Sequence, residues 1–245
     1  MSFINTIEKQ TILENAFSVM KNPSKKIYIF DGLIGAGKTT LIKRLYEHMT
    51  SLNMKVHAIF EPVDIWNTTG ALKYFYDDVP THSYEFQTFT YITRIERVLK
   101  ELHEHSNCDI FLLERSIWSD RYIFVELLKP FIGEVRMQMY NQWCDLWMYL
   151  MPLKPTKWIL LDTSLDETMR RVNIRSRDGE NKVDEDYQRN LYAKHIEFYH
   201  MLKGKGENTL CIPETKMNAD FKTNDDLIKE IFTYIMPELI TGENE

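Results

Sequence analysis

Apolar residues occur along this chain in short continuous runs that do not alternate with polar residues. The runs are rich in β-branched and aromatic residues and are separated by longer polar and amphipathic stretches. Continuous runs of this kind are typical of strands buried on both faces of a parallel sheet. We therefore predict five strands, at Lys26–Asp31, Met54–Glu61, Asp109–Glu114, Lys157–Asp162 and Asn208–Pro213.

The segments between these runs carry apolar stripes at the spacing of helices. The stripes are Leu41, Leu45, Met49 and Leu52; Tyr91, Ile95, Val98, Leu99 and Leu102; Tyr140, Trp143, Leu146, Trp147 and Leu150; and Leu227, Ile228, Ile231 and Ile235. Alternating strands and helices predict an α/β fold, a five-stranded parallel sheet with helices on both faces. No Gly-, Pro- or Ser-rich linker divides the chain, so we expect residues 1–245 to form a single domain.

The composition of the chain excludes several classes of protein but does not identify its function. With 44% apolar and 27% charged residues in 245, the chain is neither disordered nor fibrous in type. Its net charge of −6 argues against nucleic acid or an anionic membrane as a partner. We find no secretory signal pattern and no apolar run near the ~20 residues of a membrane span. Together with three separated cysteines, which predict free thiols, these features indicate a cytoplasmic protein.

The seven histidines show no spacing typical of a metal site. His82, His103, His105 and His195 are most simply interpreted as exposed or capping residues.

A phosphate-binding motif follows the first predicted strand and opens a helical stretch. Residues 32–39 fit the P-loop pattern G-x-x-x-x-G-K-[ST] completely. The glycines let successive backbone N–H groups converge on phosphate oxygens, while Lys38 reaches the β- and γ-phosphates and Thr39 can ligate Mg²⁺. The sheet is thus expected to be of the P-loop NTPase type. The predicted nucleotide-binding residues are Gly32, Leu33, Ile34, Gly35, Ala36, Gly37, Lys38, Thr39 and Thr40.

Two short charged motifs end the second and third predicted strands, Glu61-Pro62-Val63 and Glu114-Arg115-Ser116. Because ligands bind beyond the carboxyl ends of parallel strands, these side chains are expected beside the P-loop. Phosphoryl transfer to a hydroxyl needs a base, a cation and a metal ligand. We predict that Glu61, Glu114 and Arg115 supply these catalytic groups. That Glu114 joins Thr39 as an Mg²⁺ ligand is implied by the family resemblance described below.

The ordered set of motifs resembles the deoxyribonucleoside kinases, and by pocket residues the deoxycytidine and deoxyguanosine kinases most. The likeness runs from about Lys26 to Phe221 in the order and spacing of the family. It is carried by Glu61-Pro62-Val63, Trp66, Phe86-Gln87-Thr88, Arg94, Glu114-Arg115-Ser116, Asp120-Arg121-Tyr122, Arg171, Arg175, Arg177 and Asp220-Phe221.

This resemblance implies a role for each matching residue. Glu61 takes the proton of the deoxyribose 5′-OH, although which of Glu61 and Glu114 is the formal base stays open. Arg115 holds the 5′ oxygen and the transferring phosphoryl group. Gln87 forms hydrogen bonds with the edge of the base, and the rings of Trp66 and Phe124 stack on its two faces. Tyr76 and Glu180 bind the sugar 3′-OH.

Specificity is assigned, again by resemblance, to Arg94 and Asp120. In the family such a charged pair recognises cytosine and purines and fills the room that a thymine methyl needs. The resemblance therefore implies deoxycytidine or a purine deoxynucleoside over thymidine, and leaves the choice among dC, dA and dG open.

The arginine-rich stretch after the fourth strand resembles a lid over the triphosphate, at about residues 171–182. Its arginines are Arg171, Arg175 and Arg177, and the short Asp220-Phe221 segment matches the loop that holds the donor base. Together with Lys38, Arg94, Arg115 and Arg121, the lid puts positive charge at one crevice of an acidic chain.

We accordingly predict an ATP- and Mg²⁺-dependent deoxynucleoside 5′-kinase. Two alternatives stay open: a thymidylate-like nucleoside monophosphate kinase, which shares the P-loop and the E-P pair, and a non-catalytic NTP-binding regulator on the same fold. The family implies a homodimer, and the aromatic helix at Tyr140–Leu150 either forms such an interface or faces its own core.

Overall fold

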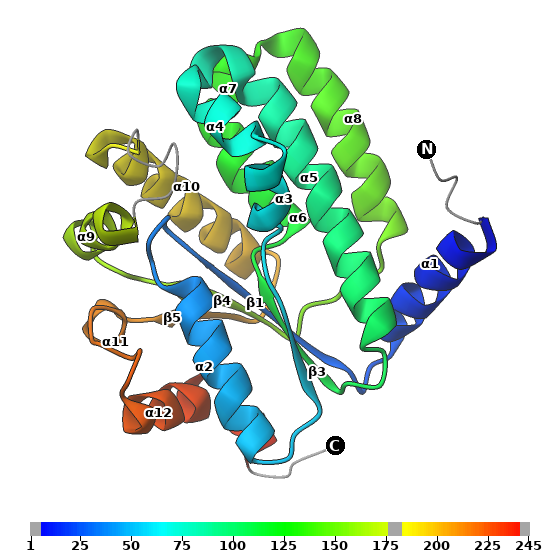
Figure 1. Cartoon of the computed structure of the whole chain (residues 1–245), viewed down its shortest axis with the longest axis vertical. Coiled ribbons are helices and arrows are strands. Elements are labelled where there is room, and N and C mark those ends of the chain that lie inside the picture. Colours follow the sequence, from blue (N-terminus) through cyan, green and yellow to red (C-terminus); the bar gives the residue numbers. More distant parts are fainter. Residues whose placement is uncertain (1–5, 176–182, 241–245) are drawn as a thin grey trace.

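Each of the five apolar runs forms a strand in the computed structural model, which describes residues 6–175 and 183–240. Every strand pair is parallel, and the order across the sheet is β2-β3-β1-β4-β5 (Figure 1). The predicted five-stranded parallel sheet is confirmed. The strands are β1 Lys26–Gly32, β2 Val56–Ile59, β3 Ile110–Glu114, β4 Lys157–Leu161 and β5 Thr209–Ile212.

Burial differs between the centre and the edges of the sheet. All residues of β3 and β4 are buried, as expected for strands covered on both faces, whereas the edge strands β2 and β5 are partly accessible. The register pairs Phe30 with Glu114 and Gly32 with Leu161, so β1 and β4 end level and β3 ends two residues earlier. This register brings the loop after β1 beside Glu114 and Arg115.

The second strand is shorter than predicted. β2 ends at Ile59, and the chain turns at Glu61, whose carbonyl accepts from the Val63 amide at 2.8 Å, before a helix begins at Val63. Pro62 has no amide hydrogen to continue a strand ladder. Glu61 therefore lies on the connection beyond the sheet, where its side chain can face the crevice.

Helices surround the sheet. Their bounds are α1 Thr6–Lys21, α2 Lys38–Ser51, α3 Val63–Thr68, α4 Ala71–Asp77, α5 Val79–Glu104, α6 Ile117–Ser119, the π-helix η1 Asp120–Phe124, α7 Val125–Ile132, α8 Glu134–Leu150, α9 Leu165–Arg175, α10 Glu185–Gly204, α11 Glu214–Met217, α12 Asp225–Ile235 and the 3₁₀-helix η3 Pro237–Leu239.

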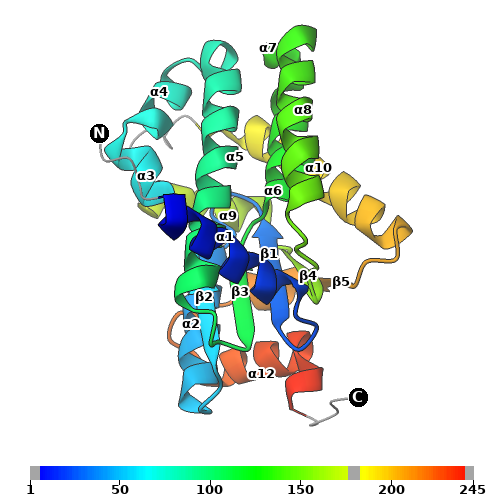
Figure 2. The ribbon, with the colours of Figure 1, turned by 90° about the vertical axis from the view of Figure 1, so that its right-hand side faces the viewer.

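These helices form a layer on each face of the sheet, as predicted. On one face α2 contacts β1, β2 and β3, and α12 packs against α2 and β5. On the other face α5 contacts β2, α10 contacts β1 and β5, and α7 and α8 extend from this layer (Figures 1 and 2). None of the described helices combines the length and apolar composition that a membrane crossing needs.

Two further segments differ from what the sequence led us to expect or are only partly described. α1 is an additional helix that packs on α5 and buries only a short apolar set, Ala16, Val19 and Met20, so its pattern is weak. The predicted lid is described only as far as Arg175, where α9 ends. Arg177 and Glu180 lie outside the described residues.

Candidate active site

The P-loop joins β1 to α2 in a conformation that only glycine adopts easily. Gly35 has φ 84° and Gly37 has φ 93°. A Cβ atom at Gly37 would lie 2.6 Å from the Phe221 ring, and one at Gly35 would lie 2.5 Å from the Thr168 carbonyl oxygen. Both positions are therefore restricted by backbone conformation and by packing, in agreement with the P-loop prediction.

Lys38 folds back over this loop. Its Nζ donates to the carbonyl oxygens of Leu33 at 2.9 Å and Gly32 at 3.3 Å. Burial, followed by the nearby Arg115 guanidinium, lowers the pKa of Lys38 to about 7. An anion bound at the loop would favour the charged ammonium, so phosphate binding and protonation of Lys38 are coupled.

Thr39 and Glu114, predicted as metal ligands, are in direct contact. The Thr39 hydroxyl lies 2.8 Å and 3.0 Å from the two carboxylate oxygens of Glu114 at the end of β3. Burial, and then the negative charge of Glu61, raises the pKa of Glu114. A hydroxyl and a carboxylate are hard oxygen donors of the type that Mg²⁺ prefers, so these residues fit the ion.

Glu61 is held between two arginines. Its Oε1 accepts from Arg94 Nη2 at 2.9 Å and lies 3.3 Å from Arg115 Nε. Burial by itself raises the pKa of Glu61, but the charges of Arg115, Arg94 and Lys38 outweigh it and lower the pKa to about 2. Glu61 is thus a fixed, ionised carboxylate at neutral pH.

Arg115 is fixed by contacts on every side. Its backbone has φ 63°, rare outside glycine, and its amide donates to the Phe30 carbonyl at 3.0 Å. The guanidinium donates to Asp31 Oδ1 at 3.0 Å and to the Gly32 carbonyl at 2.8 Å, and lies 4.7 Å from the Phe124 ring centroid. This bonding aims Arg115 at the space between the P-loop and Glu61.

His195 on α10 is the clearest correction to the sequence-based interpretation, which placed it on the surface or at a cap. It is 1% exposed and lies behind Arg115, with its Nε2 3.3 Å from Nη1 of that arginine. Its Nδ1 is 2.8 Å from the Leu191 carbonyl and can only donate there, so Nε2 carries the lone pair. Burial, and then the Arg115 charge, lowers the pKa of His195 to about 4.

Arg94 and Asp120 form a two-point ion pair in the core. Arg94 on α5 donates through Nε at 2.7 Å and Nη2 at 3.0 Å to the two oxygens of Asp120 on η1. The same Nη2 bonds to Glu61, and Nη1 donates to the Glu114 carbonyl at 3.3 Å. The predicted specificity pair is therefore connected to the predicted catalytic carboxylates.

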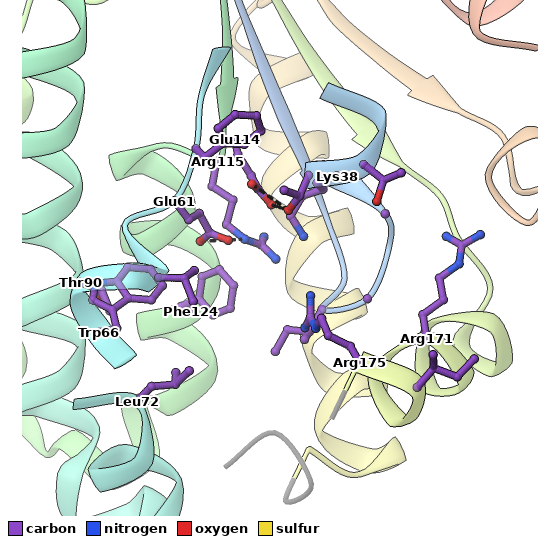
Figure 3. Close-up of a pocket in the computed structure, with 18 of the residues that line it drawn as sticks. Lys38, Glu61, Trp66, Leu72, Thr90, Glu114, Arg115, Phe124, Arg171 and Arg175 are labelled. Atoms are coloured by element: carbon purple, nitrogen blue, oxygen red, sulfur yellow. Dashed lines mark hydrogen bonds and ion pairs between the residues drawn. The ribbon is translucent and has the colours of Figure 1, made fainter. Parts of the chain in front are cut away.

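A cavity of about 780 Å³ extends from the P-loop to a group of aromatic residues. In Figure 3, Trp66, Leu72 and Phe124 lie at one end, Arg171 and Arg175 at the other, and Glu61 and Arg115 between them. Trp66 is oriented by its indole N–H, which donates to Thr93 Oγ1 at 2.9 Å. One cavity thus runs from an end at the P-loop, which we call the phosphate end, to an apolar end.

Gln87 on α5 lines the apolar end of the cavity and is 3% exposed. Its Oε1 is buried and has no hydrogen-bond partner within residues 6–175 and 183–240. Since leaving such an atom without a partner costs about 1–3 kcal/mol, a bound molecule that donates a hydrogen bond to it would be stabilised. Tyr76 on α4 also lines the cavity.

The described lid residues lie beside the phosphate end. Arg171 donates to the Ala36 carbonyl at 3.1 Å and to the Met217 carbonyl at 2.8 Å, and it pairs with Glu167. The cavity lining includes Arg171, Arg175, Asp220 and Phe221, with Phe221 buried against Gly37.

Arg121, counted from the sequence among the crevice arginines, instead pairs with Glu126 at 2.8 Å and is not among the residues that line the cavity.

Several lining residues were missed from the sequence. Arg170 directly precedes the predicted Arg171, so the arginine-rich stretch already contained its signal. Tyr187, at the start of α10, had no distinguishing motif. Leu72 and Phe75 are ordinary core residues in sequence, and only their packing places them at the apolar end. Phe86 belongs to the motif Phe86-Gln87-Thr88 but had been given no role of its own.

The deoxynucleoside kinase family model matches residues 28–241. The chain belongs to this family. It is 31% identical to a probable deoxycytidine kinase of Fowlpox virus over 82% of each chain. It is 28% identical to deoxycytidine kinase 2 of Gallus gallus, over 88% of this chain and 89% of that one. A deoxyadenosine kinase of Lactobacillus acidophilus is 24% identical over 87% and 96% of the two chains.

Membership confirms the predicted enzyme class, a kinase that uses a nucleotide phosphate donor and a deoxynucleoside acceptor. The names of these relatives favour a nucleoside kinase over the two alternatives, the monophosphate kinase and the non-catalytic regulator.

Proposed function

We propose that this kinase transfers the γ-phosphate of ATP to the 5′-OH of a deoxynucleoside, and that it prefers deoxycytidine or a purine deoxynucleoside to thymidine. The observation that carries the proposal is a single cavity with a P-loop at one end and an apolar base-sized end at the other. Glu61 and Arg115 lie between the two ends. The acceptor hydroxyl is expected there.

At the phosphate end, the triphosphate lies along the backbone N–H groups of residues 32–39 with Lys38 as counter-charge. The Phe221 ring and Asp220 take the donor base, and Arg171, Arg175 and Arg177 neutralise phosphate charge. Thr39 and Glu114 hold Mg²⁺, which supplies charge stabilisation to the β- and γ-phosphates. The contact between Thr39 and Glu114 supports this assignment.

In the middle, Glu61 accepts the hydrogen bond of the 5′-OH and then its proton. The two arginines keep Glu61 ionised at neutral pH, so its role rests on reach and orientation more than on a raised pKa. Arg115 holds the 5′ oxygen and the phosphoryl group as negative charge develops on them. Its bonds to Asp31 and Gly32 fix the guanidinium before substrate arrives.

At the apolar end, Trp66 and Phe124 stack on the base, and Gln87 reads its edge. The unpartnered Oε1 of Gln87 is an acceptor suited to an exocyclic amino group, which cytosine and adenine have and thymine lacks. Arg94 and Asp120 fill the neighbouring space as a buried ion pair. Tyr76 and Glu180 are assigned to the 3′-OH.

The test is a panel of deoxynucleosides and monophosphates incubated with purified protein, ATP and Mg²⁺ and scored for release of ADP. We expect turnover with deoxycytidine or a purine deoxynucleoside at a kcat/KM at least about tenfold above that with thymidine, the ratio of a 1.4 kcal/mol difference. A preference for thymidine would contradict the specificity assignment. Turnover restricted to monophosphates would contradict the acceptor assignment.

The proposal includes a homodimer formed through α8. One side of this helix buries Tyr140 and Cys144 in the core of the chain. The other side exposes an apolar stripe: Val135, Met139, Trp143, Leu146 and Tyr149. A run of large exposed apolar residues is typical of an interaction surface. Light scattering should give the mass of two chains, and Trp143→Glu should give that of one. A single chain before substitution would contradict the dimer.

A cytoplasmic location is also proposed. Its support is the reduced state expected of three free cysteines, Cys108, Cys144 and Cys211.

A further inference from the structure

A cluster of metal-binding side chains lies away from the cavity, where the edge strand β2 meets the end of α5. His57 comes from β2, Glu101 from the last turns of α5, and His105 is the residue that caps this helix. Glu101 and His105 are four residues apart and so share a face of the helix. The sequence did not show this group because His57 and Glu101 are 44 residues apart.

The potential ligand atoms are close enough for one ion. His57 Nε2 lies 2.8 Å and His105 Nε2 lies 3.7 Å from the same oxygen, Oε2 of Glu101. The two imidazole rings stack with centroids 3.5 Å apart, and one ligand atom from each residue lies within 4.8 Å of the others. Tetrahedral zinc with bonds of about 2.0–2.1 Å needs ligand atoms roughly 3.3 Å apart, which requires only small side-chain movements.

An arginine lies beside this group. Arg97 is 4.0 Å from the other oxygen of Glu101, Oε1, and is itself bonded to both oxygens of Asp64 at 2.8 Å. The second oxygen, Oε2, is the one that faces the two imidazoles.

We propose that His57, Glu101 and His105 form a zinc site that ties β2 to the end of α5. Two imidazoles and a carboxylate are typical zinc ligands and are poor ligands for Mg²⁺, which prefers oxygen donors. A hydrogen bond between His57 and Glu101 would account for their own contact alone. It would not account for a second imidazole stacked on the first and turned to the same carboxylate oxygen.

The site is separate from the phosphoryl-transfer centre. Glu101 and Gln87 are on the same helix, fourteen residues or about 21 Å apart at 1.5 Å per residue. A metal here would stabilise the packing of α5 on the sheet edge and would take no part in the reaction. Binding to the folded chain alone raises its apparent stability by mass action.

The experiment uses the untagged full-length chain in excess Mg²⁺, titrated with Zn²⁺ by calorimetry and with Co²⁺ by visible absorption. The matched variants are His105→Ala and Glu101→Gln, which remove a ligand, and His103→Ala. His103 is on the same helix but bonds to Asn15 at 3.0 Å, so it controls for loss of a nearby imidazole.

We expect one Zn²⁺ per chain, a higher Tm with the metal and a d–d absorption band with Co²⁺. His105→Ala and Glu101→Gln should each weaken binding by at least about tenfold, whereas His103→Ala should leave it unchanged. If the unmodified chain and His105→Ala give the same isotherm, whether both bind or neither binds, the proposal is wrong. Metal held only by the thiols of Cys108 or Cys211 would give that result.

Discussion

The two ends of the cavity are built in different ways. At the phosphate end, the proposed phosphate cradle is one continuous loop, and Gly35 and Gly37 set its backbone conformation. At the apolar end, where the base is proposed to bind and which we call the base end, Trp66, Gln87 and Phe124 come from three separate helices, α3, α5 and η1. The first end depends on local backbone geometry, and the second on how helices pack.

This difference has a consequence for mutational sensitivity. A backbone cradle fails when one residue distorts it, because its N–H groups act together. A pocket of separate side chains loses one contact at a time. We therefore expect large effects on turnover at the phosphate end and its junction with the acceptor, and graded effects on substrate ranking at the base end.

The largest effect is expected at the junction, with Glu61→Gln. The amide cannot accept the 5′-OH proton, so kcat should fall by about 10²–10⁴-fold while the nucleoside dissociation constant changes little. Steady-state kinetics and calorimetry separate these quantities. A near-normal kcat would refute the assignment of Glu61 as the base.

Gly37→Ala should disrupt the phosphate cradle. Its Cβ would lie 2.6 Å from the Phe221 ring, on a backbone with φ 93°. We expect kcat/KM for ATP to fall by about 10²-fold, from a strain of a few kcal/mol. The matched control is Gly70→Ala, which has φ 74° but open space around its Cβ among the described residues. Equal losses would mean that backbone conformation, not crowding by Phe221, is responsible.

His195, behind Arg115, should make stability depend on acid pH. Its pKa is about 4 in the folded chain, below the ordinary 6.5, so only the unfolded chain takes up the proton between those values. Stability is therefore lost as pH falls from 6.5 to 4, by up to about 3 kcal/mol from this group. Urea unfolding across this range should show a smaller loss for His195→Gln. Parallel pH profiles for the two proteins would contradict the assignment.

At the base end, Gln87→Leu should act on the acceptor alone. Replacing the amide removes the base-edge hydrogen bond proposed for its Oε1, so KM for the deoxynucleoside should rise by about 10–100-fold, or 1–3 kcal/mol. KM for ATP should not change. A rise in both values would place Gln87 in general packing instead of base recognition.

The smallest effect is expected in substrate ranking, from Arg94→Met combined with Asp120→Leu. Removing both charges avoids leaving one buried ion unpaired. The thymidine-to-deoxycytidine ratio of kcat/KM should rise a few-fold. Because Arg94 also holds Glu61, absolute rates will fall, so the ratio is the informative quantity. An unchanged ranking would contradict the specificity role of this pair.

Much of the fold was predictable because its signals are local. Continuous apolar runs marked every strand, and the predicted stripes became α2, α5, α8 and α12. The end of β2 was predicted too late. The apolar run continues to Phe60, beyond the end of the strand at Ile59, and the first residue that cannot join a strand ladder is Pro62. α1 was missed because a helix that packs on one neighbour needs only a short apolar stripe.

By itself the sequence determined the P-loop, its place between a strand and a helix, and the carboxylates at the strand ends. These features depend on neighbouring residues and on strand ends that always meet at one edge of a parallel sheet. Only the tertiary structure decided that His195 stands behind Arg115, 80 residues away, and that the buried Oε1 of Gln87 has no partner among the described residues. The packing of α5 and α10 on the sheet creates these contacts, and no local spacing in the chain records them.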